Sequence, residues 1–334
     1  MIYGAFGHPG RLWQQGNRLG DLGINAVFIG SSEIDQQTIE RTRAEDCRIF
    51  AEFPTLNGLY GDYVANHPEA HPIDETGQPA AQATWFMGAC PTDPGFRAYR
   101  MGALRTFLGA HDVDGVWMDY LHWHAQFEDP YPLLCKTCFS ESCLDSFQAA
   151  TNIAVSGDTT AEKAEWILLQ AAQAWEDWRV SVLVDWAREF HSIVKEIRPD
   201  ALVGNCQAAW KDEDFWGARR RCLGLDFDAL APYLDVFSPM PYHGRSGMPL
   251  EYVRNYVEYF STHHNIFIEP DQYPRLWPIV QAFDSPRVEP EDLATVLEYG
   301  LAGKSSGVIA FTIDSIAADP DKIEAVKKVY TGRR

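Results

Sequence analysis

Several acidic residues end short apolar runs, where buried strands would present them side by side. Asp119 lies near the end of the run Val113–Tyr120, and Glu269 ends the run Ile266–Glu269. Hydrolysis of a glycosidic bond needs one protonated carboxyl group at the leaving oxygen and one ionised group as nucleophile or as base for water. We therefore predict Asp119 and Glu269 as a catalytic pair, with either residue as the acid and Asp271 as a rival to Glu269.

A second set of polar and aromatic residues falls near the same predicted strand ends. Aromatic side chains offer flat apolar faces with polar edges, which suit sugar rings, and amide, imidazole and carboxylate groups suit sugar hydroxyls. The sequence therefore predicts a carbohydrate substrate. The predicted substrate-binding residues are Glu52, Tyr120, His122, His124, Asn205, Trp210, Tyr242, His243, Asp271, Gln272 and Asp314.

The elements that must position these residues alternate between short apolar runs and amphipathic stretches. Eight runs have the length and composition of buried parallel strands: Ile2–Phe6, Ile24–Gly30, Cys47–Phe53, Val113–Tyr120, Ala201–Gln207, Val236–Tyr242, Ile266–Glu269 and Gly307–Asp314. This alternation predicts an α/β protein, a (β/α)₈ TIM barrel that spans residues 1–334 as a single catalytic domain. The predicted catalytic residues would then share the C-terminal mouth of the barrel.

Two long loops interrupt the alternation after the third and fourth predicted strands. They are Pro54–Gly95 and Leu121–Ser140, and loops of such length inside a compact domain usually form lids or binding walls. A doubly wound sheet is the alternative fold. The first predicted strand lacks the G-x-G-x-x-G phosphate loop of that fold, so we expect no nucleotide cofactor.

Composition excludes several classes of partner. The chain has 334 residues, 46% of them hydrophobic, and its 28 Lys and Arg against 47 Asp and Glu give a net charge of −19. Such a surface repels nucleic acids and anionic membranes, and no apolar run approaches the length of a membrane span. The seven cysteines do not suggest a disulfide framework. We expect a cytoplasmic protein, or a secreted one whose signal peptide has been removed.

Four segments carry a resemblance to known proteins. They read DETGQPAAQATWFMGACPTDPGFRAY, VDGVWMDYLHW, CFSESCLDSF and FSPMPYH, and they span roughly positions 70 to 245. In these segments the chain resembles the glycosyl-hydrolase-like proteins with TIM-barrel folds and, more distantly, the family 42 β-galactosidases. The resemblance implies a glycoside hydrolase and a catalytic role for Asp119.

The same resemblance implies a candidate structural zinc site. Relatives share a run with the pattern C-(F/Y)-C-x-x-C-x-x-x-F, and here Cys138 and Cys143 keep its outer positions while Ser140 replaces the middle cysteine. Cys135 and Cys90 could complete a set of four thiolates, which tetrahedral structural zinc requires. The alternative is a group of metal-free thiols that pack inside a loop.

Two other functions fit the same residues. A barrel that binds carbohydrate without hydrolysing it would use the acids to hold hydroxyl groups. A metal-dependent barrel hydrolase or isomerase would use His122 and His124, although two histidines without a matching carboxylate motif form a weak ligand set.

Overall fold

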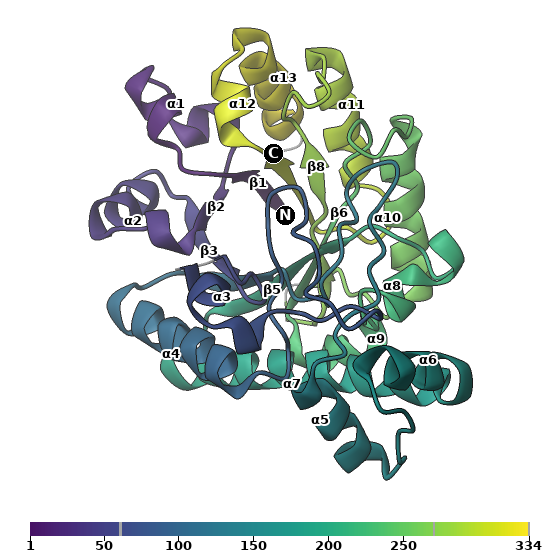
Figure 1. Ribbon diagram of the computed structural model, residues 1–334. Helices are drawn as coiled ribbons and strands as arrows, with labels where there is room; N and C mark the ends of the chain where they lie inside the picture. Colours follow the sequence, from purple (N-terminus) through teal and green to yellow (C-terminus); the bar gives the residue numbers. More distant parts are fainter. Residues whose placement is uncertain (60–61, 270, 333–334) are drawn as a thin grey trace.

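The computed structural model describes residues 1–59, 62–269 and 271–332. Its core is one parallel sheet in the order β7-β6-β5-β4-β3-β2-β1-β9-β8, which curls into a barrel (Figure 1). The strands are β1 (Ile2–Phe6), β2 (Ala26–Gly30), β3 (Arg48–Pro54), β4 (Gly115–Asp119), β5 (Leu202–Ala208), β6 (Val236–Met240), β7 (Arg275–Leu276), β8 (Ile279–Gln281) and β9 (Gly307–Phe311). The predicted α/β barrel is confirmed.

The barrel closes through two short strands that act as one. β7 pairs with β6, whereas β8 pairs with β9, and only residues 277 and 278 separate β7 from β8. Across this break, the N–H of Trp277 donates to the carbonyl of Phe237 on one side, and the carbonyl of Pro278 accepts from the N–H of Ile309 on the other. Pro278 has no N–H to donate, which interrupts the regular ladder at this point.

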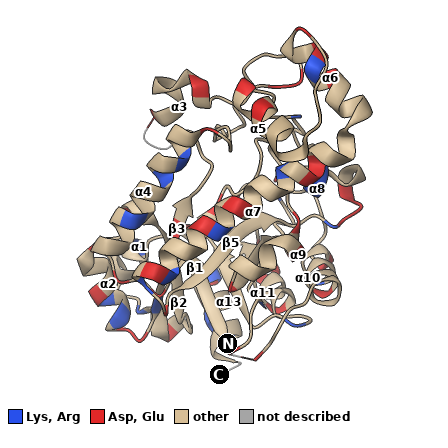
Figure 2. Ribbon diagram, turned by 90° about the horizontal axis from the view of Figure 1, so that it is seen from below, with Lys and Arg blue, Asp and Glu red and all other residues tan. Residues whose placement is uncertain are grey.

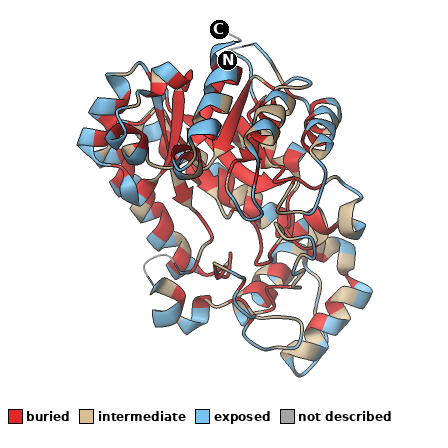
Figure 3. Cartoon of the chain, turned by 90° about the horizontal axis from the view of Figure 1, so that it is seen from above, coloured by how far each residue is buried: buried red, intermediate tan, exposed pale blue. Residues whose placement is uncertain are grey.

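Helices surround the barrel, and their exposed faces point outward while the strands are buried (Figure 3). The helices are α1 (Gly10–Gln14), α2 (Gln36–Arg43), α3 (Tyr63–Asn66), α4 (Pro94–Ala110), α5 (Glu141–Thr151), α6 (Thr160–Gln170), α7 (Ala172–Ile197), α8 (Ala218–Arg221), α9 (Phe227–Leu230), α10 (Glu251–His263), α11 (Pro290–Gly300), α12 (Ile313–Ala317) and α13 (Pro320–Thr331). None of the described helices is both long and apolar enough to span a membrane.

Aromatic rings fill the interior of the barrel. Trp117 and Trp277 stack with their ring centroids 5.7 Å apart, and Phe50 packs against Trp117 at 4.9 Å. Gly204 leaves room for these rings, because a Cβ atom at this position would lie 2.2 Å from the indole of Trp117. The interior is therefore a packed core that separates the two ends of the barrel.

The prediction of the seventh strand is wrong. Residues Ile266–Glu269 form no strand, and Ile268 is 54% exposed. The segment turns back instead, since the N–H of Phe267 donates to the carbonyl of Pro274. Pairing with β6 begins only at Arg275, whose N–H donates to the carbonyl of Asp235. Glu269 therefore precedes the seventh strand and does not end it.

The long segments after β3 and β4 gather at one end of the barrel. Helices α3, α5 and α6 lie at this end, and both chain termini lie at the other (Figure 2). Because the chain leaves each strand at its C-terminal end, this is the end where TIM barrels form their sites. The predicted long loops after the third and fourth strands are confirmed.

Candidate active site

Asp119 is the last residue of β4 and lies at the C-terminal mouth. Alternation along the strand places it on the same face as Trp117, the face that lines the barrel interior. Its Oδ1 accepts the N–H of Tyr120 at 2.8 Å, and Tyr120 has a left-handed φ of 56°. That rare conformation ends the strand abruptly and turns the chain into the loop that forms the cavity wall.

Glu52 on β3 lies beside Asp119 and shares its electrostatic environment. In the parallel ladder Glu52 pairs with Trp117 and Pro54 pairs with Asp119, so both carboxyl groups emerge from neighbouring strands. Burial raises the pKa of Asp119 to about 6. Burial, followed by the charge of Asp119, raises the pKa of Glu52 well above its ordinary value. Repulsion between the two carboxylates favours a state in which Asp119 and Glu52 share one proton.

Glu128 supplies a carboxyl group that the sequence reasoning missed. It lies in the loop after β4, and only 16% of its side chain is exposed. Burial raises the pKa of Glu128 to about 7, although the guanidinium of Arg245, with its Nε 3.3 Å from Oε2, acts in the opposite direction. The negative charge of Asp119 also raises the pKa of Glu128, so the ionisation of one carboxyl group affects the other.

Asp119 and Glu128 line one small cavity at the mouth. Its other lining residues are mostly aromatic or apolar: Phe6, Trp85, Phe86, Tyr120, His122, Phe127, Cys206, Met240, Tyr242, Ile279 and Phe311. Trp85 lines this cavity, and the guanidinium of Arg245 lies 4.2 Å from the centroid of its indole ring.

His122 is a neutral hydrogen-bonding group in the cavity wall. Burial lowers its pKa to about 4. Its Nδ1 lies 2.8 Å from the carbonyl of Trp123 and donates to it, which leaves Nε2 as an acceptor. Nε2 is buried and has no partner within the described part of the chain. An acceptor in this position can bind a ligand hydroxyl.

Other predicted substrate-binding residues lie at the mouth with different surroundings. Tyr242 lines the cavity, and its ring stacks on Phe311. Trp210 is buried behind the wall, with its ring 6.1 Å from that of Phe127. His243 is also buried but does not line the cavity.

His124, Asn205 and Asp314 do not face the cavity. His124 is 1% exposed, and both ring nitrogens bond to the backbone, Nδ1 to the N–H of Gly88 and Nε2 to the carbonyl of Ala81. Asn205 lies on the outward face of β5 and donates to Gln207. Asp314 lies in the first turn of α12 and is exposed. For these three, the pattern identified the correct end of the barrel but not the direction of the side chain.

The predicted residues around the seventh strand lie at the opposite end. Glu269, Asp271 and Gln272 are exposed and precede β7. Asp271 lines an open depression with Asp114 and Asp200, which stand before β4 and β5. The pairing of Glu269 with Asp119 is therefore corrected, because the packed interior of the barrel separates them.

The wall residues that the sequence reasoning missed come from the two long loops. Trp85 and Phe86 belong to the loop after β3, and Phe127 and Glu128 belong to the loop after β4. Arg245 follows β6. Loop residues carry no periodic signal. The available sign was the acidic and aromatic run QFEDPY, which begins seven residues after the strand-end aspartate.

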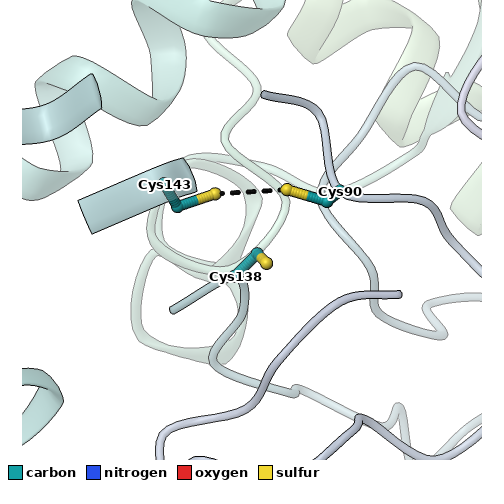
Figure 4. A group of neighbouring side chains, drawn as sticks. All are labelled: Cys90, Cys138 and Cys143. Carbon is teal, nitrogen blue, oxygen red and sulfur yellow. Dashed lines mark hydrogen bonds between the residues drawn. The ribbon is translucent and has the colours of Figure 1, made fainter. Parts of the chain in front are cut away.

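Three of the four candidate zinc ligands converge (Figure 4). The sulfur atoms of Cys90, Cys138 and Cys143 all lie within 4.8 Å of one another, and all three residues are buried. Cys135 is not part of this group. The donor set suits a thiophilic metal ion with three sulfur ligands, but it does not supply the four thiolates of a Cys₄ zinc site.

Comparisons with known proteins agree with this architecture. No protein-family model matches the sequence, and no curated protein matches it. The fold is similar to the glycoside hydrolase domain of PgaB (BpsB) from Bordetella bronchiseptica, with a TM-score of 0.74, 15% identity and 99% of each chain covered. It is also similar to a catalytic mutant of Gan42B, a family 42 β-galactosidase from G. stearothermophilus, with a TM-score of 0.67 and 10% identity.

The chain covers these proteins to different extents. It spans 56% of the Gan42B chain, whereas it spans 98% of the catalytic domain of a β-amylase from Paenibacillus polymyxa, with a TM-score of 0.61 and 10% identity. The structural resemblance to TIM-barrel glycoside hydrolases, including family 42, is thereby confirmed for the fold. At these identities the catalytic residues of the relatives do not transfer.

Proposed function

We propose that this protein is a glycoside hydrolase in which Asp119 and Glu128 flank the bond that is cleaved. The observation that carries the proposal is the pair of carboxyl groups on one aromatic-lined cavity, with pKa values raised to about 6 and about 7. The fold supports the proposal, because TIM barrels form their active sites at this mouth.

The two pKa values divide the roles. Between pH 6 and 7, Asp119 is mostly ionised and Glu128 is mostly protonated. Glu128 is then the general acid that protonates the leaving oxygen, and Asp119 is the nucleophile or the base that activates water. Glu52 lies next to Asp119, and its raised pKa keeps it protonated, so that it can donate a hydrogen bond to the ionised aspartate.

The wall provides contacts for a sugar ring. Trp85, Tyr120 and Tyr242 offer aromatic faces, and Nε2 of His122 can accept a hydroxyl hydrogen. The cavity is small and is covered by loop side chains, so we expect these side chains to move aside when substrate enters. Arg245 holds Trp85 by stacking and Glu128 by charge, and it is the contact that such movement would break.

Asp119→Asn tests the proposal most directly. The protein is assayed against a panel of aryl glycosides and β-linked and α-linked oligosaccharides at pH 6.5. The amide cannot act as nucleophile or base, and we expect kcat on any cleaved substrate to fall by about 10³-fold, with KM changed little. Asp114→Asn is the matched control, because Asp114 belongs to the same chain segment but lies at the other end of the barrel.

Two results would contradict the proposal. One is a variant Asp119→Asn that keeps more than about a tenth of the parental kcat. The other is binding of oligosaccharides without any turnover by the parent protein, which would identify a carbohydrate-binding barrel. Calorimetric titration of both proteins with the same oligosaccharides distinguishes these cases.

A further inference from the structure

A second pocket lies where the end of α6, the start of α7 and α8 meet the loop after β4 (Figure 1). Three of its lining residues are cations: Lys136 from the loop, Arg179 from α7 and Arg221 from α8. Among the described residues that line it, Glu176 is the one acid. The whole chain has a net charge of −19, so a lining with an excess of positive charge stands apart from the rest of the molecule. It indicates an anionic ligand.

Arg179 is a buried cation that forms no ion pair with the described residues, and only 2% of it is exposed. Its Nη1 donates to the carbonyl of Arg221 at 2.5 Å and its Nη2 donates to the carbonyl of Cys222 at 2.7 Å. Its Nε is buried and has no hydrogen-bond partner within the described part of the chain. Burial lowers the pKa of Arg179 to about 10, so the side chain stays charged at neutral pH. A buried charge of this kind costs stability, and an anionic ligand would offset that cost.

The other two cations also lack a carboxylate partner. Lys136 and Arg221 form no ion pair with a described residue, and the guanidinium of Arg221 contacts two backbone carbonyl groups at 3.4 Å. Asp177, which is adjacent to the pocket on α7, binds Arg220 through its Oδ1 at 2.5 Å. Its charge is therefore compensated by a residue outside the pocket, and the three lining cations remain available to a ligand.

The arrangement of the donors distinguishes between two kinds of anion. A carboxylate has two oxygens, and the parallel N–H groups of one Arg side chain usually bind both. In Arg179 both terminal nitrogens already donate to backbone carbonyls, which leaves only Nε. Three separate cations on a loop and two helices can instead contact the three free oxygens of a phosphate monoester. The pocket therefore favours a phosphate group over a carboxylate.

We propose that Lys136, Arg179 and Arg221 bind the phosphate group of a small ligand, which is a phosphorylated sugar or the free ion. Leu168 and Trp175 also line the pocket, so an organic phosphate gains apolar contact that inorganic phosphate lacks. The bound phosphate links the loop after β4 to α7 and α8. This site is independent of the proposed hydrolase activity, because the pocket and the proposed active site share no lining residue.

Calorimetric titration of the full chain at low ionic strength tests the site. The titrants are inorganic phosphate, glucose 6-phosphate and glucuronate. We expect saturable binding of both phosphates, weaker binding of glucuronate, and a rise in the midpoint of thermal unfolding with each phosphate. The two dissociation constants identify the source of the phosphate. Tighter binding of glucose 6-phosphate indicates a phosphorylated sugar, and equal or tighter binding of inorganic phosphate indicates the free ion.

Substitutions that change a single charge locate the binding. Lys136→Gln should weaken phosphate binding at least about fivefold, because it removes one charged donor. Glu176→Gln should tighten phosphate binding at least about threefold, because it removes the carboxylate that repels the ligand. Lys163→Gln is the matched control. It removes a positive charge from α6 outside the pocket, and it should bind phosphate like the parent.

Three results would overturn the proposal. They are no saturable binding of either phosphate by the parent up to about 10 mM, tighter binding of glucuronate than of glucose 6-phosphate, or an equal loss of affinity in Lys163→Gln and Lys136→Gln. The test does not depend on a variant of Arg179, whose bonds to two carbonyl groups hold α7 against the end of α8. The gain of affinity in Glu176→Gln also requires a folded protein, so loss of the fold cannot imitate it.

Discussion

The two ends of the barrel hold their aspartates in different ways. At the N-terminal end, Oδ2 of Asp114 accepts the N–H of Ile49 at 2.8 Å. Oδ2 of Asp235 accepts both the N–H of Val203 and the ammonium of Lys195, each at 2.8 Å. These carboxylates link neighbouring strands, and the N–H and ammonium groups that donate to them stabilise their negative charge.

At the C-terminal mouth, carboxyl groups are buried beside each other. Asp119 accepts the N–H of the following residue, and its environment raises its pKa to about 6. Glu52 and Glu128 lie close enough for the charge of Asp119 to raise their pKa values as well. At the C-terminal mouth the surroundings therefore disfavour the ionised carboxylates, whereas at the N-terminal end hydrogen-bond donors stabilise them.

The difference separates structural aspartates from candidate catalytic ones without any knowledge of the reaction. A buried carboxylate with strong donors stabilises the fold, and its removal destabilises the protein. A buried carboxyl group that lacks such donors and faces another acid destabilises the fold. Groups of that kind are typical of active sites, where a proton must be held and released near neutral pH.

The largest effect that follows concerns Glu128→Gln. We expect the parental kcat/KM to rise with pH through about 6 as Asp119 ionises and to fall through about 7 as Glu128 loses its proton. Glutamine cannot donate the proton, so kcat/KM should drop about 10²-fold and the fall near pH 7 should disappear. A pH–rate profile on the best aryl glycoside measures both.

Asp129→Asn provides the matched control for Glu128→Gln. Asp129 is the next residue, it also contacts Arg245 at 3.4 Å, and its side chain is 39% exposed. It should keep both limbs of the profile. If Glu128→Gln retained the limb near pH 7, the general acid would be another group, and Glu52 would be the first alternative.

The second prediction concerns stability, and it has opposite signs at the two ends. The folded pKa of Asp119 is raised above the ordinary value of 3.8, so its ionisation lowers the free energy of unfolding as pH rises from about 4 to about 6, and the loss is complete above that range. At pH 8, Asp119→Asn should therefore raise the free energy of unfolding by about 1 to 3 kcal/mol, and this gain should vanish at pH 4.

Asp235→Ala should have the reverse effect. It leaves the N–H of Val203 and the ammonium of Lys195 without their acceptor, and the free energy of unfolding should fall by about 2 to 3 kcal/mol. Denaturant unfolding of both variants at pH 8 makes the comparison. Destabilisation by Asp119→Asn at that pH would remove the distinction between the two ends.

The sequence predicted the barrel and the position of Asp119 at its mouth because both depend on local pattern. Strands β1 to β6 and β9 are short runs of mostly apolar residues, and parallel pairing then brings their C-terminal ends to one rim. Asp119 could be identified because it ends a regular strand. The direction of Asn205 could not, since a strand buried on both faces gives no signal of which face is inside.

The errors came from residues that tertiary contacts place. The seventh strand consists of two short pieces separated by Trp277 and Pro278, so the sequence pattern favours the more regular apolar run Ile266–Glu269 in its place. Glu128 reaches the cavity through a loop held by Arg245, a contact between segments 117 residues apart in the chain. The thiol cluster also depends on distant packing, which joined Cys90 to the other cysteines and left Cys135 out.

The smallest expected effect is the sharpest test of the corrected site. Glu269 is exposed and stands before β7, so Glu269→Gln should change kcat by less than about twofold and the free energy of unfolding by less than about 0.5 kcal/mol. Glu52→Gln is the comparison at the mouth, where loss of the group beside Asp119 should shift the lower limb of the pH–rate profile. Loss of turnover in Glu269→Gln but not in Glu52→Gln would contradict the corrected site. It would mean that the segment ending at Glu269 forms the seventh strand and carries Glu269 to the mouth. That arrangement would break the pairing of Arg275 with Val236, and with it the closure of the barrel.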